Sequence, residues 1–340
     1  MAFDESHRGQ MPIRKLGLTI ENSPLEAIVN SIYAELEARG IRLKPRFYLS
    51  TEWGVPTGTI AVAIPFYLAS TELTEVHGDR VGHVEGFDPH DIARYLRHEV
   101  GHAVNYGYKL YERTEWIERF GSITQPYVED YRPVPFSERY VVHLPGWYAQ
   151  KHPDEDWAET FAVWLTPGVD WKKRYEAWPP VIAKLAYCDR VMSALSGKEP
   201  IVTSTELDED VGEIDASIDQ FYEGGLATDE LPRGLDGAIR AIFDDFRSTG
   251  AAPASELLQS MERDLLANVY RWTGHFPERT RALLQFLSKR AKELKQVYPI
   301  ERKASVMIAV TTLVTALAMN HVIRGTYASE ASSGVPGPSR

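Results

Sequence analysis

The sequence contains a single cysteine, Cys188, among 340 residues. One thiol excludes an intrachain disulfide and any metal site built from several cysteines. Basic residues are also few, because 37 Lys and Arg stand against 48 Asp and Glu and leave a net charge of -11. Binding a phosphate backbone requires clustered positive charge, so this balance argues against a nucleic-acid partner. Any metal must therefore be held by histidine and carboxylate side chains.

Long apolar runs are nearly absent as well. Residues 1–15 contain no apolar stretch of signal-peptide length, which predicts a cytoplasmic protein. One uncharged stretch, residues 304–320, approaches the length of a membrane span. Its threonines and alanines fit a buried helix of a bundle better, and we therefore expect no membrane association.

One short stretch carries a metal-binding pattern. Residues 98–102, His-Glu-Val-Gly-His, match H-E-x-x-H. Two histidines four residues apart lie on the same face of a helix, so both imidazoles can reach one ion, and the glutamate between them can hold a water against it. The pattern predicts that His98 and His102 bind Zn²⁺ and that Glu99 acts as a general base. Two neutral imidazoles and a carboxylate suit zinc best among divalent ions.

The surroundings of this motif predict a helix. Asp88 and Pro89 are typical of an N-cap followed by proline at the first helical position, and Gly107 is typical of a helix end. Apolar residues recur between them at helical spacing. Within the helix Gly101 costs about 1 kcal/mol relative to alanine. A small residue there indicates that another segment passes close to the motif.

Catalytic zinc normally has three protein ligands, so a third must come from elsewhere in the chain. Glu115 and Glu118 lie downstream at a plausible distance, but they belong to a run of alternating charges that is typical of a solvated face. A second helix, expected at 153–165, offers Glu155, Asp156 and Glu159. Glu155 and Glu159 are four residues apart and share a face. The residues alone leave these three acids as candidates.

The segments 98–102 and 155–161 together resemble the bacterial zinc-binding metallopeptidases of the gluzincin group. They are more distantly similar to the catalytic domain of anthrax lethal factor and to the proline-specific endopeptidases related to it. The resemblance covers roughly residues 45–190. It implies a zincin-like fold, with Glu155 as the third zinc ligand and Glu159 supporting a histidine ligand. It also implies that Tyr148, seven residues before that ligand, faces the active site.

The implied activity is hydrolysis of a peptide bond in a peptide or protein substrate. Zinc lowers the pKa of a bound water and polarises a carbonyl. Glu99 would take the proton of that water, Tyr148 would donate to the oxyanion, and Glu159 would fix a histidine tautomer. One alternative is a catalytically silent zincin-fold binding or regulatory module, against which the intact Glu99 argues. Another is a zinc hydrolase of a small amide.

Residues 59–68 are rich in β-branched and aromatic side chains and predict a strand. Pro65 cannot donate to a ladder, which places the strand at a sheet edge. An extended peptide could add to that edge, with Ile64, Phe66 and Tyr67 as substrate contacts. A purely structural edge strand is equally consistent with the pattern. The long polar and aromatic segment 108–142 is a candidate wall of the cleft.

The predicted fold class is α+β, with a zincin-like metallopeptidase domain followed by an all-α helical domain. Eight acids without a basic residue between 203 and 223 indicate a linker. We expect a metallopeptidase domain at 1–200, an acidic linker at 201–230, a helical domain at 231–328 and a disordered tail at 329–340. The helical domain is a candidate surface for a partner or for self-association. Outside the motif region, periodicity predicts a strand at 46–50 and helices at 25–36, 179–195, 235–246, 257–272, 283–294 and 304–322.

Overall fold

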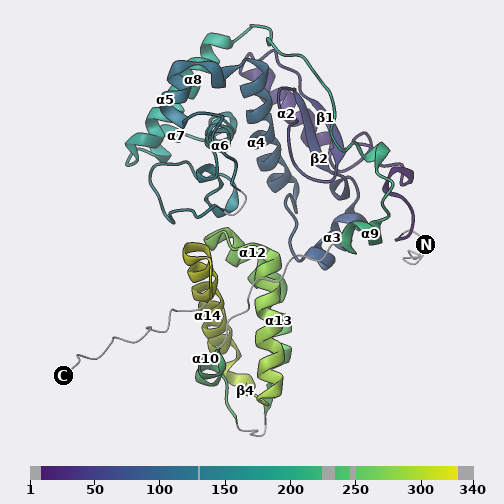
Figure 1. Cartoon of the computed structure of the whole chain (residues 1–340), viewed down its shortest axis with the longest axis vertical. Coiled ribbons are helices and arrows are strands. Elements are labelled where there is room, and N and C mark those ends of the chain that lie inside the picture. Colours follow the sequence, from purple (N-terminus) through teal and green to yellow (C-terminus); the bar gives the residue numbers. More distant parts are fainter. Residues whose placement is uncertain (1–8, 129–130, 224–233, 246–249, 328–340) are drawn as a thin grey trace, which may run out of the picture. The chain divides into compact units, whose positions relative to one another are not determined.

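The chain forms two compact units, each with its own hydrophobic core, in a computed structural model (Figure 1). Unit 1 comprises Met1–Arg80 and Val84–Gly225, and unit 2 comprises Val81–His83 and Leu226–Arg340. The structure describes residues 9–128, 131–223, 234–245 and 250–327. The expected tail at 329–340 and the end of the expected linker, 224–230, lie outside these residues.

Unit 1 is an α+β unit in which helices greatly outnumber strands. The α-helices and the short 3₁₀ helices, which are labelled η, surround one small sheet. In chain order its elements are η1 Ile13–Lys15, α2 Glu26–Ala38, β1 Arg46–Ser50, β2 Ala61–Pro65, η2 Phe66–Ala69, α3 Thr71–Val81, α4 Pro89–Gly107, η3 Leu110–Glu112, α5 Thr114–Phe120, η4 Pro145–Gln150, α6 Pro153–Leu165, α7 Trp171–Arg174, α8 Pro179–Leu195, η5 Val211–Glu213 and α9 Ile218–Glu223.

The sheet of unit 1 has two parallel strands, with Arg46 of β1 opposite Ala61 of β2. The other edge of β2 is already covered, because the Ala63 backbone N–H donates to the Gly54 carbonyl at 2.8 Å. Pro65 has no N–H to offer there. Every residue of β2 is also buried. This edge therefore lacks the row of free backbone donors that an added peptide strand requires.

The three residues expected to contact substrate lie in the hydrophobic core instead. Ile64 is 0 % exposed, Phe66 1 % and Tyr67 5 %. Phe66 and Tyr67 belong to η2 rather than to the strand, which ends at Pro65. Burial of large apolar side chains explains their β-branched and aromatic pattern. These positions stabilise unit 1 and are not available to a substrate.

The acidic stretch after α8 packs along unit 1. The Ile60 backbone N–H donates to the Ser204 carbonyl at 2.8 Å, the Tyr48 hydroxyl to the Asp208 carbonyl at 2.9 Å, and the Ile13 N–H to the Ala216 carbonyl at 2.9 Å. The backbone of this stretch binds the unit while most of its acidic side chains face solvent. Ile218 of α9 is buried in the same core. Residues 201–223 therefore belong to unit 1.

The helix that contains the motif has the predicted bounds. The Asp88 carboxylate accepts from the Asp91 backbone N–H at 2.8 Å, Pro89 begins α4, and Gly107 ends it. Nearly the whole helix is buried. This agreement reflects local signals, since the cap, the proline and the glycine act within a few residues of themselves.

The second helix of the site, α6, crosses α4 in close contact (Figure 1). A Cβ atom on Gly101 would lie 2.8 Å from the Ala158 Cα atom. The Trp157 indole N–H donates to the Gly101 carbonyl at 2.9 Å. All thirteen residues of α6 are buried. The small residue at position 101 thus allows the two backbones to approach, as its place in the motif predicted.

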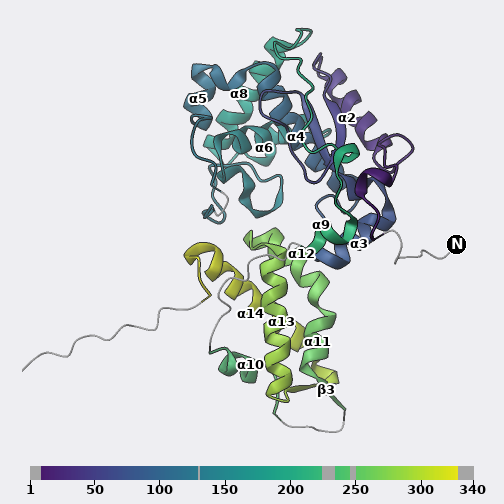
Figure 2. The same cartoon turned by 45° about the vertical axis from the view of Figure 1, so that its right-hand side comes forward.

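Unit 2 is a helical bundle with a small antiparallel sheet, so it is not purely α-helical as expected. Helix α13 packs against α11, α12 and α14 (Figure 2). The helix expected at 257–272 is divided into two near Met261. The elements of unit 2 are α10 Asp236–Ile242, β3 Ala251–Pro253, α11 Ala254–Ser260, α12 Glu262–Thr273, α13 Pro277–Glu293, β4 Val297–Pro299, η6 Ile300–Arg302 and α14 Lys303–Arg324.

The last helical stretch is apolar along its length. By length and composition Ile300–Arg324 would be able to cross a membrane, with a mean hydropathy of 1.9 over its most apolar part. Only 28 % of that part is buried. The buried side chains, including Val306, Val310 and Val314, follow one face of α14 and join the core of unit 2. The absence of membrane association remains a prediction.

His275, between α12 and α13, connects α13 to the segment that follows α14 through buried hydrogen bonds. His275 is 1 % exposed, and its two ring nitrogens lie 2.7 Å from the Thr280 hydroxyl and 2.7 Å from the Tyr327 hydroxyl. Burial lowers the pKa of His275 to about 3, and the positive charges of His321 and Arg279 act in the same direction. The ring is therefore neutral in the folded protein at any pH near neutrality.

We expect Gly101→Ala to destabilise unit 1 by about 1–3 kcal/mol, because the overlap with the Ala158 backbone outweighs the gain of about 1 kcal/mol in helix propensity. Tryptophan fluorescence during urea unfolding measures this, since every tryptophan except Trp272 lies in unit 1. Gly54→Ala, also in unit 1, is the control, because a Cβ atom there meets open space. The same unfolding midpoint for Gly101→Ala and the unaltered protein would contradict the close contact.

We expect unit 2 to lose stability as the pH falls from about 6.5 towards 3. In that window the unfolded chain binds a proton at His275, with its ordinary pKa of 6.5, whereas the folded chain does not, so protonation favours unfolding. His275→Asn removes the titration, and its unfolding midpoint should change less between pH 7 and 5 than that of the unaltered protein. Circular dichroism measures both profiles. Parallel profiles would show that His275 does not set the acid sensitivity.

Candidate metal centre

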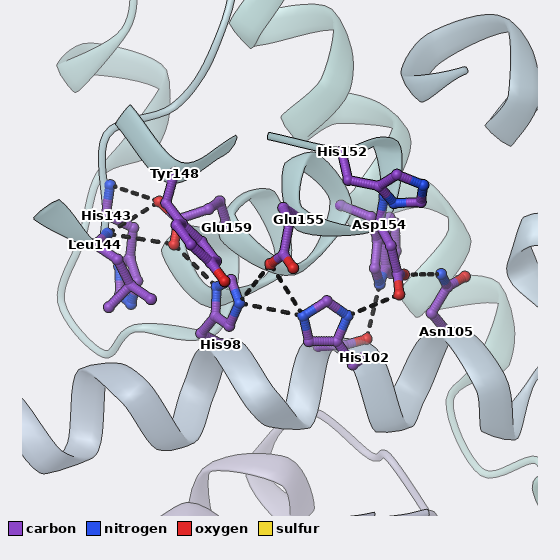
Figure 3. Close-up of polar contacts among 12 residues, drawn as sticks. His98, His102, Asn105, His143, Leu144, Tyr148, His152, Asp154, Glu155 and Glu159 are labelled. Carbon is purple, nitrogen blue, oxygen red and sulfur yellow. Dashed lines mark hydrogen bonds and ion pairs between the residues drawn. The ribbon is translucent and has the colours of Figure 1, made fainter. Parts of the chain in front are cut away.

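Three buried side chains from α4 and α6 converge on one point. Figure 3 shows His98 and His102 rising from α4 and Glu155, from the first turn of α6, directed between them. One ligand atom from each residue lies within 4.8 Å of the other two. The three residues are 1 %, 8 % and 5 % exposed, respectively. The carboxylate and both imidazoles thus form a compact group inside the protein.

The distances within this group fit a metal ion. The Nε2 atoms of His98 and His102 are 3.1 Å apart, and the Glu155 Oε2 atom lies 2.9 Å and 3.3 Å from them. Zinc–ligand bonds of 2.0–2.1 Å in a tetrahedral site place neighbouring ligand atoms about 3.3 Å apart. Two imidazole nitrogens that face each other at this distance also need a shared cation or proton between them. The donor set suits a divalent ion such as zinc.

Glu159 fixes the orientation of His98. Its Oε1 atom lies 2.9 Å from the His98 Nδ1 atom, and the carboxylate also accepts from the backbone N–H groups of His143 and Leu144 at 3.1 Å and 2.9 Å. A carboxylate at Nδ1 keeps the proton on that nitrogen and leaves Nε2 free for an ion. Burial opposes a charge on His98, but Glu155 and Glu159 outweigh it and raise the pKa of His98 to about 9.

His102 also lies beside a carboxylate, that of Asp154, which was not among the candidate site residues. The Asp154 Oδ2 atom lies 3.0 Å from the His102 Nδ1 atom, although not in line with the N–H direction of a hydrogen bond. The Tyr106 hydroxyl and the Asn105 amide each donate to Asp154 at 2.6 Å. Asn105 and Tyr106 follow His102 by three and four positions, so their shared helix face was the signal available in the sequence.

Two of the other candidate acids, Asp156 and Glu115, pair with basic residues instead. The Asp156 carboxylate pairs with the Lys184 ammonium at 2.6 Å, and that ammonium also donates to the Arg139 carbonyl at 2.9 Å. Glu115, on α5, forms surface ion pairs with Arg190 and Arg119. Among the candidates for the third ligand, Glu155 approaches the Nε2 atoms of both histidines, whereas Glu159 contacts His98 at Nδ1.

Glu99 is buried on α4 beside the two histidines. Burial raises its pKa; His98 and His102 oppose that shift, whereas the charges of Glu155 and Asp154 reinforce it. A carboxylate whose pKa is raised in this way is a better proton acceptor than an exposed one. Glu99 is thus a buried carboxylate of raised pKa in the same helix as the two histidines.

Tyr148 lies over the first histidine. Its ring centroid is 5.6 Å from that of His98, and Figure 3 shows the ring alongside the metal-binding group. The backbone before it is kinked, with φ of 78° at Gly146 and 54° at Trp147 inside η4. A left-handed conformation is rare for tryptophan and indicates a constrained turn. Burial and the charge of Glu155 raise the pKa of Tyr148 well above its ordinary value, so the hydroxyl remains a donor.

Tyr127 also reaches the site, from the long segment between α5 and η4 that we expected to line the cleft. Its hydroxyl donates to the Glu155 Oε1 atom at 2.8 Å. No periodicity or motif in the sequence singled this residue out. Its role depends on a contact across 28 residues of chain, which local patterns do not report.

No family model, curated protein or solved structure matches the chain. The resemblance to gluzincins stays limited to short motifs, and the case for a metal centre depends on the geometry of the site.

Asp154→Asn should weaken zinc binding about 10- to 100-fold, because the amide holds His102 less firmly than the carboxylate does. Competition with a zinc chelator measures the affinity. Asp208→Asn is the control, since it removes the same charge from an exposed position of unit 1. Equal affinities for the two variants would show that Asp154 does not support the site.

Proposed function

We propose that this protein is a zinc-dependent metallopeptidase. The observation that carries the proposal is the buried group of His98, His102 and Glu155, with Glu99 in the same helix between the two histidines. A purely structural metal site has no use for a buried carboxylate of raised pKa beside the ion. Zinc would supply a water of lowered pKa and polarise the substrate carbonyl when bound by this group.

The remaining residues provide proton transfer and charge stabilisation. Glu99 would accept a proton from the attacking water and return it to the leaving amine. Tyr148, which stays protonated in its buried environment, would donate to the oxygen on which negative charge develops. Glu159 and Asp154 would hold the two imidazoles in the orientation that the ligand role requires.

Replacing Glu99 tests the proposal. Glu99→Gln should retain one zinc per chain, because residue 99 is not among the three converging ligands, and it should lower peptide cleavage by a factor of about 10² to 10⁴. Metal analysis and a peptide-library digest read by mass spectrometry measure the two quantities. Glu112→Gln, at an exposed position, is the control and should behave as the unaltered protein does.

Three outcomes would overturn parts of the proposal. Equal cleavage by Glu99→Gln and the unaltered protein would exclude Glu99 as the base. Zinc binding without cleavage of any peptide or small amide would favour the silent binding module. Cleavage restricted to small amides would assign the same machinery to an amidohydrolase.

A further inference from the structure

Tyr127 contacts one of the two carboxylate oxygens of Glu155, the proposed third ligand, and the histidines contact the other. Its hydroxyl lies 2.8 Å from the Glu155 Oε1 atom, whereas Oε2 is the oxygen that faces the His98 and His102 Nε2 atoms at 2.9 Å and 3.3 Å. One oxygen is therefore held by a phenol and the other is directed at the ion position. A carboxylate held in this way presents a single oxygen to a metal.

The same hydroxyl meets Tyr148. The two phenol oxygens are 3.2 Å apart. An ionised carboxylate only accepts hydrogen bonds, so Tyr127 gives its one proton to Glu155. The proton between the two tyrosines must then come from Tyr148. Without substrate, the proton that the proposed oxyanion donor would use is thus directed at Tyr127.

The rings of Tyr127 and Tyr148 also share a contact in which their hydroxyls take no part. The Lys151 ammonium lies 4.3 Å from the Tyr127 ring centroid and 5.3 Å from that of Tyr148. The Tyr127 ring also lies 5.4 Å from the ring of His152, which caps α6. Cation–π and ring contacts of this kind hold the rings in place. Removing the Tyr127 hydroxyl alone should therefore leave the ring where it is.

We propose that Tyr127 is a positioning residue that holds Glu155 Oε1, so that Oε2 would be the oxygen offered to an ion, and that accepts the Tyr148 hydrogen bond until substrate arrives. The inference deepens the proposed function and rests on it. A developing oxyanion, which carries negative charge, is a stronger acceptor than the Tyr127 phenol. Tyr148 therefore turns its proton to the oxyanion, and the Tyr127–Glu155 bond stays in place.

Tyr127→Phe tests this role through metal binding, independently of turnover. Without the phenol, Oε1 is free to approach the ion and Glu155 is less well oriented. We expect zinc affinity, measured by chelator competition, to fall about 10-fold. We also expect the visible spectrum of the cobalt-substituted protein to lose intensity, because the second Glu155 oxygen would become available to the ion and an added ligand atom weakens the absorption of cobalt. Tyr127 is 46 % exposed, so the variant should fold.

Two matched variants isolate the contact. Tyr131→Phe removes a hydroxyl of the same segment that donates to the Gly146 carbonyl at 2.7 Å rather than to Glu155, and it should leave zinc affinity unchanged. Tyr148→Phe leaves the Tyr127–Glu155 bond intact, so it should keep zinc affinity and lower kcat more than Tyr127→Phe does at saturating zinc. An unchanged affinity and cobalt spectrum in Tyr127→Phe would overturn the inference while leaving the proposed function standing. Failure of the unaltered protein to bind zinc would overturn the proposed function itself.

Discussion

The close crossing of α4 and α6 is the constraint on which the site depends. His98 and His102 come from one helix and Glu155 from the other, so the ligand atoms lie about 3 Å apart because the two helices pack closely. Gly101 permits this, because any side chain there would overlap Ala158. The glycine thus allows the close helix packing that brings His98, His102 and Glu155 together.

Burial of α6 creates an electrostatic requirement that a metal ion would satisfy. Its first two turns place four carboxylates, those of residues 154, 155, 156 and 159, inside the protein. Burying a charge is costly unless it is paired. Lys184 pairs with Asp156, and backbone or side-chain donors satisfy Asp154 and Glu159. Glu155 has two imidazoles and a phenol as partners, and a cation between the imidazoles would compensate its charge without protonating either ring.

Sequence reasoning succeeded where signals act over a few residues. Caps, proline and glycine predicted the bounds of α4, and motif spacing predicted that both histidines share a face. It failed where the answer depends on contacts far along the chain. The pattern around Ile64 and Tyr67 is the same for a free edge strand and for one covered by another segment. In the structure Gly54 covers the edge of β2. Whether Asp156 faces an ion or Lys184 depends on where α8 lies.

The edge of β2 is closed to an added peptide strand. The hydrogen bonds and large side chains of β2 belong to the core, so affinity cannot come from strand addition there. Of the side chains in hydrogen-bond contact with Glu155, the two histidines are buried and Tyr127 is 46 % exposed. The segment between α5 and η4 thus provides the solvent-facing side of the ligand group. If the chain cleaves peptides, this segment supplies the phenol that orients Glu155, and Tyr148, the proposed proton donor, follows directly after it in η4.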